Sequence, residues 1–189
     1  MKELSIYQIK DKALTSGRSV FSVQQLSNLI GKPKNISTVY MSRLLKKHLA
    51  FRLIKGKISF LKDDLIIATQ LVEPSYISLD SALLFHHLIK QAQKNVECVT
   101  TRNSKNYSDL NIIYHKIPKE LFFGYKRYNM ADSYVFVAEP EKAIIDGLYL
   151  NRYSEIDISE HKKLNFSKYA EILKKFNGKG NKKLKKMIY

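Results

Sequence analysis

Basic, amide and hydroxyl side chains recur along residues 34–57 of this 189-residue chain. Ammonium and guanidinium groups neutralise phosphates, whereas hydroxyl, amide and guanidinium groups form hydrogen bonds with the edges of bases. This combination of residue types is typical of a surface that binds duplex DNA. The candidate DNA-binding residues are Lys34, Asn35, Ser37, Thr38, Ser42, Arg43, Lys46, Arg52, Lys55 and Lys57.

Carboxylates gather in a second region, at Asp132, Glu139, Glu141 and Asp146. A nuclease of the restriction-endonuclease type needs an Asp and, on the next strand, a Glu-x-Lys to hold magnesium. Here Glu141 is followed directly by Lys142, at the expected start of a helix. We therefore interpret Glu139 and Glu141 as residues that cap this helix and compensate its dipole.

Other patterns for catalysis or metal binding are weak. His86 and His87 are adjacent, so they face different sides of a helix, and the sequence has no two-histidine metal spacing. Cys98, the single cysteine, lies between valines in an expected strand and is interpreted as buried filler. No glycine-rich phosphate loop occurs among the 7 glycines. The sequence predicts a protein that is not an enzyme and that needs no metal or cofactor.

The positive charge is unevenly distributed along the chain. Of the net charge of +16, residues 1–62 hold +11, residues 63–173 hold −2 and the last sixteen residues hold +7. This asymmetry is typical of a polyanion-binding module joined to a domain with another task. The alternative is a lysine-rich composition with solvated surfaces, but that would spread the charge evenly.

Length and composition restrict the class of protein. A chain of 189 residues is expected to form one large domain or two small ones. One cysteine cannot form an internal disulfide, which indicates a reducing compartment. No apolar run approaches the roughly 18 to 20 residues needed to span a bilayer. We expect a cytoplasmic protein without a membrane segment.

The basic N-terminal region, residues 1–62, is predicted to fold as a winged helix-turn-helix. Helices are expected over residues 2–15, then from the Ser22 N-cap to Gly31, and then over residues 36–49, with a hairpin formed by residues 51–54 and 57–61. On the third helix, the inward side chains are expected to be Met41, Leu44, Leu45 and His48. Ser37 has an alternative role as a cap of this helix, and Lys46 as part of a solvated face.

The rest of the chain is predicted to form a small mixed-sheet α/β domain, so the fold class is α+β. Helices are expected over residues 79–92, with Ser78 as cap, and over residues 139–153 and 167–176. Strands are expected over residues 95–101, 110–117 and 133–138, and residues 120–132 form a strand or a loop. The predicted domains are residues 1–72 and 73–176, followed by a basic tail over residues 177–189 that either adds phosphate contacts or only solubilises the end.

Two motifs that follow the basic N-terminal region resemble the AbiEi family of antitoxins, the transcriptional regulators of type IV toxin-antitoxin systems. The first contains Tyr76, Ser78, Ser81, Ala82 and Leu83, and the second contains Ala138, Pro140, Glu141, Lys142, Ala143, Asp146 and Leu148. The resemblance covers about residues 18–150. One departure is His48, where members of the family often have Gly.

The resemblance implies a repressor that binds inverted repeats in its own promoter through the winged helix. It also implies that the protein counteracts a nucleotidyltransferase-like toxin without forming a stable complex with it. Inverted repeats fit either a dimer or two monomers that bind side by side. Because no heptad pattern indicates a dimer seam, we expect a monomer in solution. Two alternatives remain open: a DNA-processing enzyme such as a nuclease, and a winged-helix scaffold for another protein that binds nucleic acid without specificity.

Overall fold

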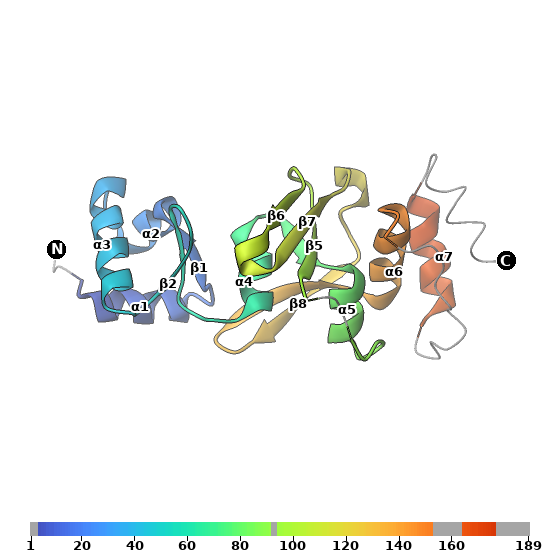
Figure 1. Cartoon of the computed structure of the whole chain (residues 1–189), viewed down its shortest axis with the longest axis horizontal. Coiled ribbons are helices and arrows are strands. Elements are labelled where there is room, and N and C mark those ends of the chain that lie inside the picture. Colours follow the sequence, from blue (N-terminus) through green and yellow to red (C-terminus); the bar gives the residue numbers. More distant parts are fainter. Residues whose placement is uncertain (1–3, 92–93, 153–163, 177–189) are drawn as a thin grey trace. The chain divides into compact units, whose positions relative to one another are not determined.

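The computed structural model describes residues 4–91, 94–152 and 164–176, and it divides into two compact units. Unit 1 comprises residues up to Leu71 together with Tyr128–Val135, and unit 2 comprises Val72–Arg127 and the residues from Phe136 onward. Both units contain helices and strands (Figure 1). The three-stranded sheet lies in unit 1 and most of the six-stranded sheet lies in unit 2, so the predicted α+β class is confirmed. The predicted tail over residues 177–189 lies outside the described residues.

Unit 1 contains four helices and a three-stranded sheet among its described residues. In chain order they are α1 (Ile6–Thr15), β1 (Val20–Ser22), α2 (Val23–Ile30), α3 (Lys34–Lys46), β2 (Phe51–Ile54), β3 (Lys57–Ser59) and α4 (Asp64–Leu71). The sheet order is β1-β3-β2, with both pairs antiparallel. Strand β1 is too short to show a period-2 pattern, which is why the sequence did not predict it.

The first two helices each begin after a serine cap. The cap at Ser22 was predicted, whereas the first helix, expected from residue 2, begins at Ile6 after Ser5. Ser5 and Ser22 each accept from the backbone N–H three residues later, while the side chains of Gln8 and Gln25 accept from the serine backbone, so both starts are capping boxes. Helix α2 ends at Gly31, whose φ of 64° is the left-handed conformation that glycine adopts at little cost. The core of unit 1 contains Ile9, Ala13, Phe21, Leu26, Ile30, Tyr40, Met41, Leu44, Ala50, Ile58 and Phe60.

A buried glutamine holds together separate parts of unit 1. The side-chain oxygen of Gln70 accepts from the backbone N–H groups of Ser19 and Val20 at 2.9 and 3.0 Å. Its side-chain nitrogen donates to the Ser133 hydroxyl at 2.9 Å and to the Tyr134 carbonyl at 3.1 Å. All four hydrogen-bonding positions of this carboxamide are therefore used, as a buried polar group requires.

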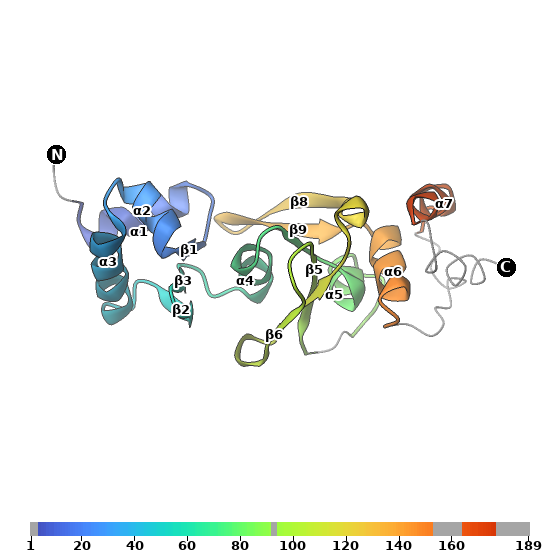
Figure 2. The ribbon, with the colours of Figure 1, turned by 90° about the horizontal axis from the view of Figure 1, so that it is seen from above.

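Unit 2 is built on a mixed sheet whose strand order is β6-β7-β5-β4-β9-β8. The elements from residue 72 onward are β4 (Ser75–Ile77), α5 (Leu79–Phe85), β5 (Val96–Thr100), β6 (Lys105–Tyr107), β7 (Ile112–Lys116), β8 (Tyr125–Met130), β9 (Ser133–Ala138), α6 (Pro140–Tyr149) and α7 (Phe166–Lys175), with two short 3-10 turns before and after β7. The ends of β8 and β9 that join each other, Tyr128–Val135, belong to unit 1. Strand β4 pairs antiparallel with β5 and parallel with β9, and β5 pairs parallel with β7. Strands β8 and β9 run side by side as a hairpin (Figure 2).

Several element predictions need correction. The helix expected over residues 79–92 ends at Phe85, because His87 takes a left-handed φ of 57° and its N–H donates to Leu84. Ser78 does not cap this helix; its hydroxyl donates to Asp146 instead. The segment left open as a strand or a loop contains strand β8. Strands β4 and β6, three residues each, were not predicted.

Candidate nucleic-acid interface

Helix α3 begins two residues earlier and ends sooner than the sequence predicts. Lys34 and Asn35 already belong to it, and Pro33 precedes the first turn. The helix ends because His48 has a φ of 53°; its N–H donates to Leu45, and that of Leu49 donates to Leu44. These two hydrogen bonds form a Schellman motif, in which the left-handed position is usually glycine. His48 is therefore exposed and does not pack inward as expected.

The buried side of α3 consists of Ser37, Tyr40, Met41 and Leu44, which face the core of unit 1. This spacing of three and four residues leaves one continuous side of the helix in solvent. The exposed side chains include Lys34, Asn35, Thr38, Ser42, Arg43 and Lys46, six of the predicted DNA-binding residues. The structure therefore brings these six together on one element.

Ser37 does not belong to this exposed side. Its residue surface is wholly buried, and its hydroxyl donates to the backbone carbonyls of Pro33 at 3.0 Å and Lys32 at 3.3 Å. A hydroxyl turned into the helix start cannot reach a base edge, so we remove Ser37 from the proposed interface. Its role is to stabilise the first turn of α3, close to the capping role considered as the alternative.

Two exposed residues on α3 are pre-positioned by contacts with their own helix. The Arg43 guanidinium lies over the ring of Tyr40, 5.7 Å from its centroid. The Thr38 hydroxyl donates to the Lys34 carbonyl at 2.9 Å, which fixes its rotamer and leaves its oxygen able to accept. Ordering a long side chain in advance lowers the conformational entropy that binding must remove.

The hairpin of β2 and β3 follows α3, and its two-residue turn is Lys55-Gly56, with a φ of 77° at the glycine. Arg52 and Lys55 are exposed. Lys57 is half-buried, and its ammonium donates to the Leu71 carbonyl within unit 1. The expectation that Lys57 stands at the hairpin tip to reach a phosphate is therefore not supported by its position.

The electrostatic character of this region follows from its sequence. Residues 12–62 contain eleven Lys and Arg and no Asp or Glu. A surface with charges of a single sign has a positive potential that attracts polyanions and is weakened by salt. The exposed side of α3 and the hairpin both lie within this stretch.

Sequence analysis missed two exposed side chains on the same helix. Ile36 is 41% exposed and Val39 is 48% exposed. Aliphatic residues usually indicate core positions, and only their phase relative to Tyr40, Met41 and Leu44 could have placed them on the outer face.

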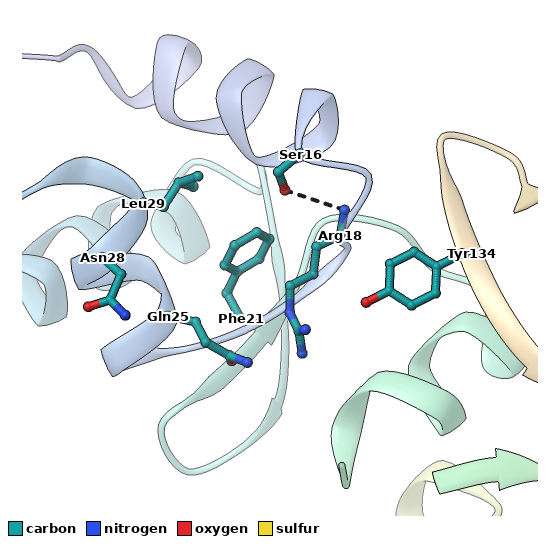
Figure 3. A pocket seen from close by; sticks show the side chains of 7 residues that line it. All are labelled: Ser16, Arg18, Phe21, Gln25, Asn28, Leu29 and Tyr134. Carbon is teal, nitrogen blue, oxygen red and sulfur yellow. Dashed lines mark hydrogen bonds between the residues drawn. The ribbon is translucent and has the colours of Figure 1, made fainter. Parts of the chain in front are cut away.

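A hollow of about 450 Å³ lies in unit 1 between α1, α2 and residue Tyr134 (Figure 3). Its walls are Ser16, Arg18, Phe21, Gln25, Asn28, Leu29 and Tyr134. The Arg18 side chain is held by the Val20 carbonyl, to which its Nε donates at 2.7 Å, and its backbone N–H donates to the Ser16 hydroxyl. The hollow is open to solvent, and the Arg18 guanidinium that lines it already donates to the backbone. We therefore interpret the hollow as a surface depression of unit 1 and not as its functional site.

Unit 2 contains a buried polar cluster formed by Tyr76, Ser78, Lys142 and Asp146, four positions of the two family-like motifs. The Lys142 ammonium donates to the Asp146 carboxylate and, at 2.9 Å, to the Tyr76 hydroxyl. The other carboxylate oxygen accepts from Tyr76 and Ser78, both at 2.9 Å. Burial lowers the pKa of Lys142 and raises that of Asp146, and in each case the charge of the partner opposes the effect of burial.

Aromatic rings complete the surroundings of Lys142. Its ammonium lies 5.4, 5.3 and 5.1 Å from the ring centroids of Tyr76, Phe123 and Phe176. Glycine is favoured at position 124 beside it, because the φ there is 75° and a Cβ would lie 3.0 Å from the lysine Cγ. The cluster therefore satisfies its own charges inside the core and presents no open position to a substrate.

The carboxylates considered for a nuclease are not gathered into one site. Glu139 accepts from Lys126 at 2.8 Å and from Lys168 at 2.6 Å, and Glu141 accepts from the backbone N–H of Asn165. Glu139 does not cap α6 through its side chain, contrary to expectation, although Pro140 occupies the first turn as predicted. Within the described ranges, no group of three or more His, Cys, Asp or Glu is arranged to hold a metal ion.

Cys98 is buried in β5, as expected, and burial raises the pKa of its thiol well above the ordinary range. None of the helices in the described part of the chain combines the length and the apolar character needed to cross a membrane. A comparison of the sequence with protein-family models finds no match, and a comparison with curated proteins finds none either.

Proposed function

We propose that this chain is a sequence-specific DNA-binding transcriptional autorepressor whose recognition helix is α3. The observation that carries the proposal is the outer side of α3, where Asn35, Ser42, Arg43 and Lys46 are exposed within a stretch of 51 residues, 12–62, without an acidic side chain. Cations on that side contact phosphates, and the amide, hydroxyl and guanidinium groups contact base edges.

The order of elements in unit 1 supports a winged helix. Helices α2 and α3 are separated by three residues, and a two-stranded hairpin follows α3 directly. In this arrangement α3 enters the major groove, and the hairpin with Arg52 and Lys55 contacts the adjacent backbone. The proposed interface therefore consists of Lys34, Asn35, Thr38, Ser42, Arg43, Lys46, Arg52 and Lys55.

We further propose that the repressor is the antitoxin of a type IV toxin-antitoxin system, on the strength of the two motifs that resemble the AbiEi family. In this proposal it binds inverted repeats in its own promoter, as a monomer in solution that pairs on DNA. It counteracts a nucleotidyltransferase-like toxin without a stable complex. The internal satisfaction of the Lys142–Asp146 cluster supports a binding role for unit 2 instead of an enzymatic one.

The deciding experiment is a salt-titrated binding assay of the full chain on its own upstream DNA and on a scrambled duplex of equal length. We expect a preference of about a thousandfold for the upstream DNA at near-physiological salt. We also expect the affinity to fall linearly on a log–log plot against salt. Equal affinities for the two duplexes would contradict the autorepressor and favour the scaffold with nonspecific nucleic-acid binding.

The antitoxin role has a separate test. Expression of the neighbouring gene should arrest growth, and co-expression of this chain should restore it. Rescue by a chain that cannot bind DNA would show that repression and neutralisation are separate activities. Failure of rescue by the intact chain would remove the antitoxin role while leaving the repressor intact.

A further inference from the structure

Two aliphatic side chains stand in solvent on a helix that is otherwise polar on that side. Ile36 and Val39 are among the five large hydrophobic residues that are exposed in the described part of the chain; the others are Tyr7, Phe51 and Leu84. A single exposed aliphatic group is ordinary. Two of them three residues apart on α3 lie one turn from each other on the same side of the helix.

The surroundings of these two side chains limit what could cover them. Asn35, Arg43 and Lys46 are exposed on the same helix, and the whole stretch of residues 12–62 lacks acidic residues. An apolar protein surface placed here would have to remove water from several cations without supplying an opposite charge. A partner must therefore combine dense negative charge with small apolar groups.

Duplex DNA has this combination in its major groove. The phosphates supply the charge, and the C5-methyl group of thymine is the apolar group on the floor of the groove. Three residues of helix rise about 4.5 Å along the axis, close to the 3.4 Å spacing of bases along a strand. Side chains at positions 36 and 39 can therefore meet neighbouring base pairs.

We propose that Ile36 and Val39 contact thymine methyl groups on adjacent base pairs, so that the recognition sequence contains thymines where these side chains lie. This inference rests on the proposed function, because it requires α3 to enter the major groove. It names a sequence preference that the polar residues of α3 do not imply. The Thr38 hydroxyl, between these two residues in the sequence, already donates to the Lys34 carbonyl and keeps only its acceptor capacity for a base.

The test starts by selecting bound sequences from a randomised duplex library with the full chain. Each thymine of the selected sequence is then replaced by uracil, which removes only the C5-methyl group. We expect about fourfold weaker binding at one or two positions in each half-site, because a buried methylene-sized group contributes about that factor. At other positions the replacement should leave the affinity unchanged.

Protein variants connect the effect to the two side chains. In Ile36→Ala and Val39→Ala the sensitivity to uracil should disappear at one position each, while Leu84→Ala, an exposed aliphatic residue in unit 2, should keep it. Val39→Thr keeps the shape of the side chain and provides a second variant if truncation disturbs the helix, and it should show reduced sensitivity. Circular dichroism of every variant checks that α3 remains folded.

The outcomes separate this inference from the function on which it rests. If the chain binds duplexes with a salt dependence but no thymine-to-uracil replacement weakens binding, the inference is overturned and the DNA-binding proposal stands. The same holds if the sensitivity persists unchanged in both alanine variants. If the chain binds no duplex even at low salt, both are overturned.

Discussion

The two units use lysine in opposite ways. In unit 1, Lys34, Lys46 and Lys55 are exposed, in a stretch of sequence that offers no acidic neighbour. In unit 2, Lys142 is wholly buried, and its ammonium is bonded to Asp146 and Tyr76. A buried charge must be neutralised inside the chain, whereas an exposed set of like charges is left for a partner outside it.

This difference separates a region whose charges stay exposed from a region whose charges are satisfied inside the chain. The family-like motif that includes Lys142 and Asp146 would suggest chemistry if only residue types were considered. Its geometry instead pairs the ammonium with the carboxylate and the Tyr76 hydroxyl within the core and surrounds the ammonium with aromatic rings. Buried polar groups of this kind contribute to specifying one packing arrangement, which is our hypothesis for this cluster.

The largest expected effect concerns the buried lysine. Lys142→Ala should destabilise unit 2 by about 3–5 kcal/mol, because it leaves the Asp146 carboxylate buried without a compensating charge. Urea unfolding followed by circular dichroism measures the loss. Lys168→Ala, which removes a half-exposed cation from Glu139, is the matched control and should cost less than about 1 kcal/mol.

A double variant distinguishes the missing charge from the missing packing. Lys142→Met combined with Asp146→Leu removes both charges and keeps most of the volume, so it should recover much of the stability that Lys142→Ala removes. A Lys142→Ala protein that is as stable as the control would contradict the contrast between the two units. It would mean that the cluster is hydrated and not part of the core.

The next effect tests the exposed cations. Replacing Arg43 and Lys46 together by Ala should weaken binding to the upstream DNA and lower the slope of log affinity against log salt by about two, one for each phosphate that the variant no longer neutralises. The stability of the protein should stay within about 0.5 kcal/mol, since both side chains are exposed. Lys119→Ala, an exposed cation in unit 2, is the control for net charge. An unchanged slope would remove both residues from the interface.

Sequence analysis predicted most of the regular elements because their signals are local. The serine cap at Ser22, the glycine that ends α2 and the proline in the first turn of α6 act within one turn of helix, so residue types alone reveal them. Strand β9 was predicted with its full extent because residues 133–138 are rich in valine and aromatic side chains, which favour strands.

What could not be predicted depends on contacts between distant residues. Ser78 precedes an apolar helix, which indicates a cap, but its hydroxyl bonds Asp146, 68 residues later in the chain. The ends of α3 and α5 have no glycine, so nothing local indicated the left-handed His48 and His87. On α3, the burial of Ser37 and the exposure of Ile36 both follow from the orientation of the helix on its core, which its polar pattern alone did not specify.

The left-handed residues after α3 and α5 give a prediction of smaller size that compares the stability of a helix end in each unit. His48→Gly in unit 1 and His87→Gly in unit 2 should each stabilise the protein by about 1 kcal/mol, because glycine takes a left-handed φ without a Cβ clash. The unfolded chain of each variant gains entropy, which offsets part of this gain. Thermal unfolding measures both, and Lys47→Gly, one residue before His48 and not left-handed, should be destabilising. Destabilisation by His48→Gly would mean that the imidazole itself stabilises the end of α3.

The smallest effect is a pH dependence of stability that comes from Glu139. Its side chain is more exposed than that of Lys142 and less exposed than the cations of unit 1. Burial opposes ionisation, but hydrogen bonds from Lys126 and Lys168 hold the pKa of Glu139 below its ordinary 4.5. A folded-state pKa that is lowered contributes stability above the unfolded-state value, and that contribution is lost as the pH falls through the folded-state value.

Glu139→Gln should therefore be less stable than the unchanged protein at pH 7, by less than about 1 kcal/mol because Lys126 is 64% exposed. The difference should be constant between pH 6 and 8 and should shrink as the pH falls below about 4.5, where the unfolded carboxylate begins to take up its proton. Urea unfolding at several pH values measures it, with Glu171→Gln, exposed on α7, as the control. A difference that grew on acidification would mean that Glu139 is protonated in the folded protein, and the charge pairs of unit 2 would then resemble the buried cluster more than the surface of α3.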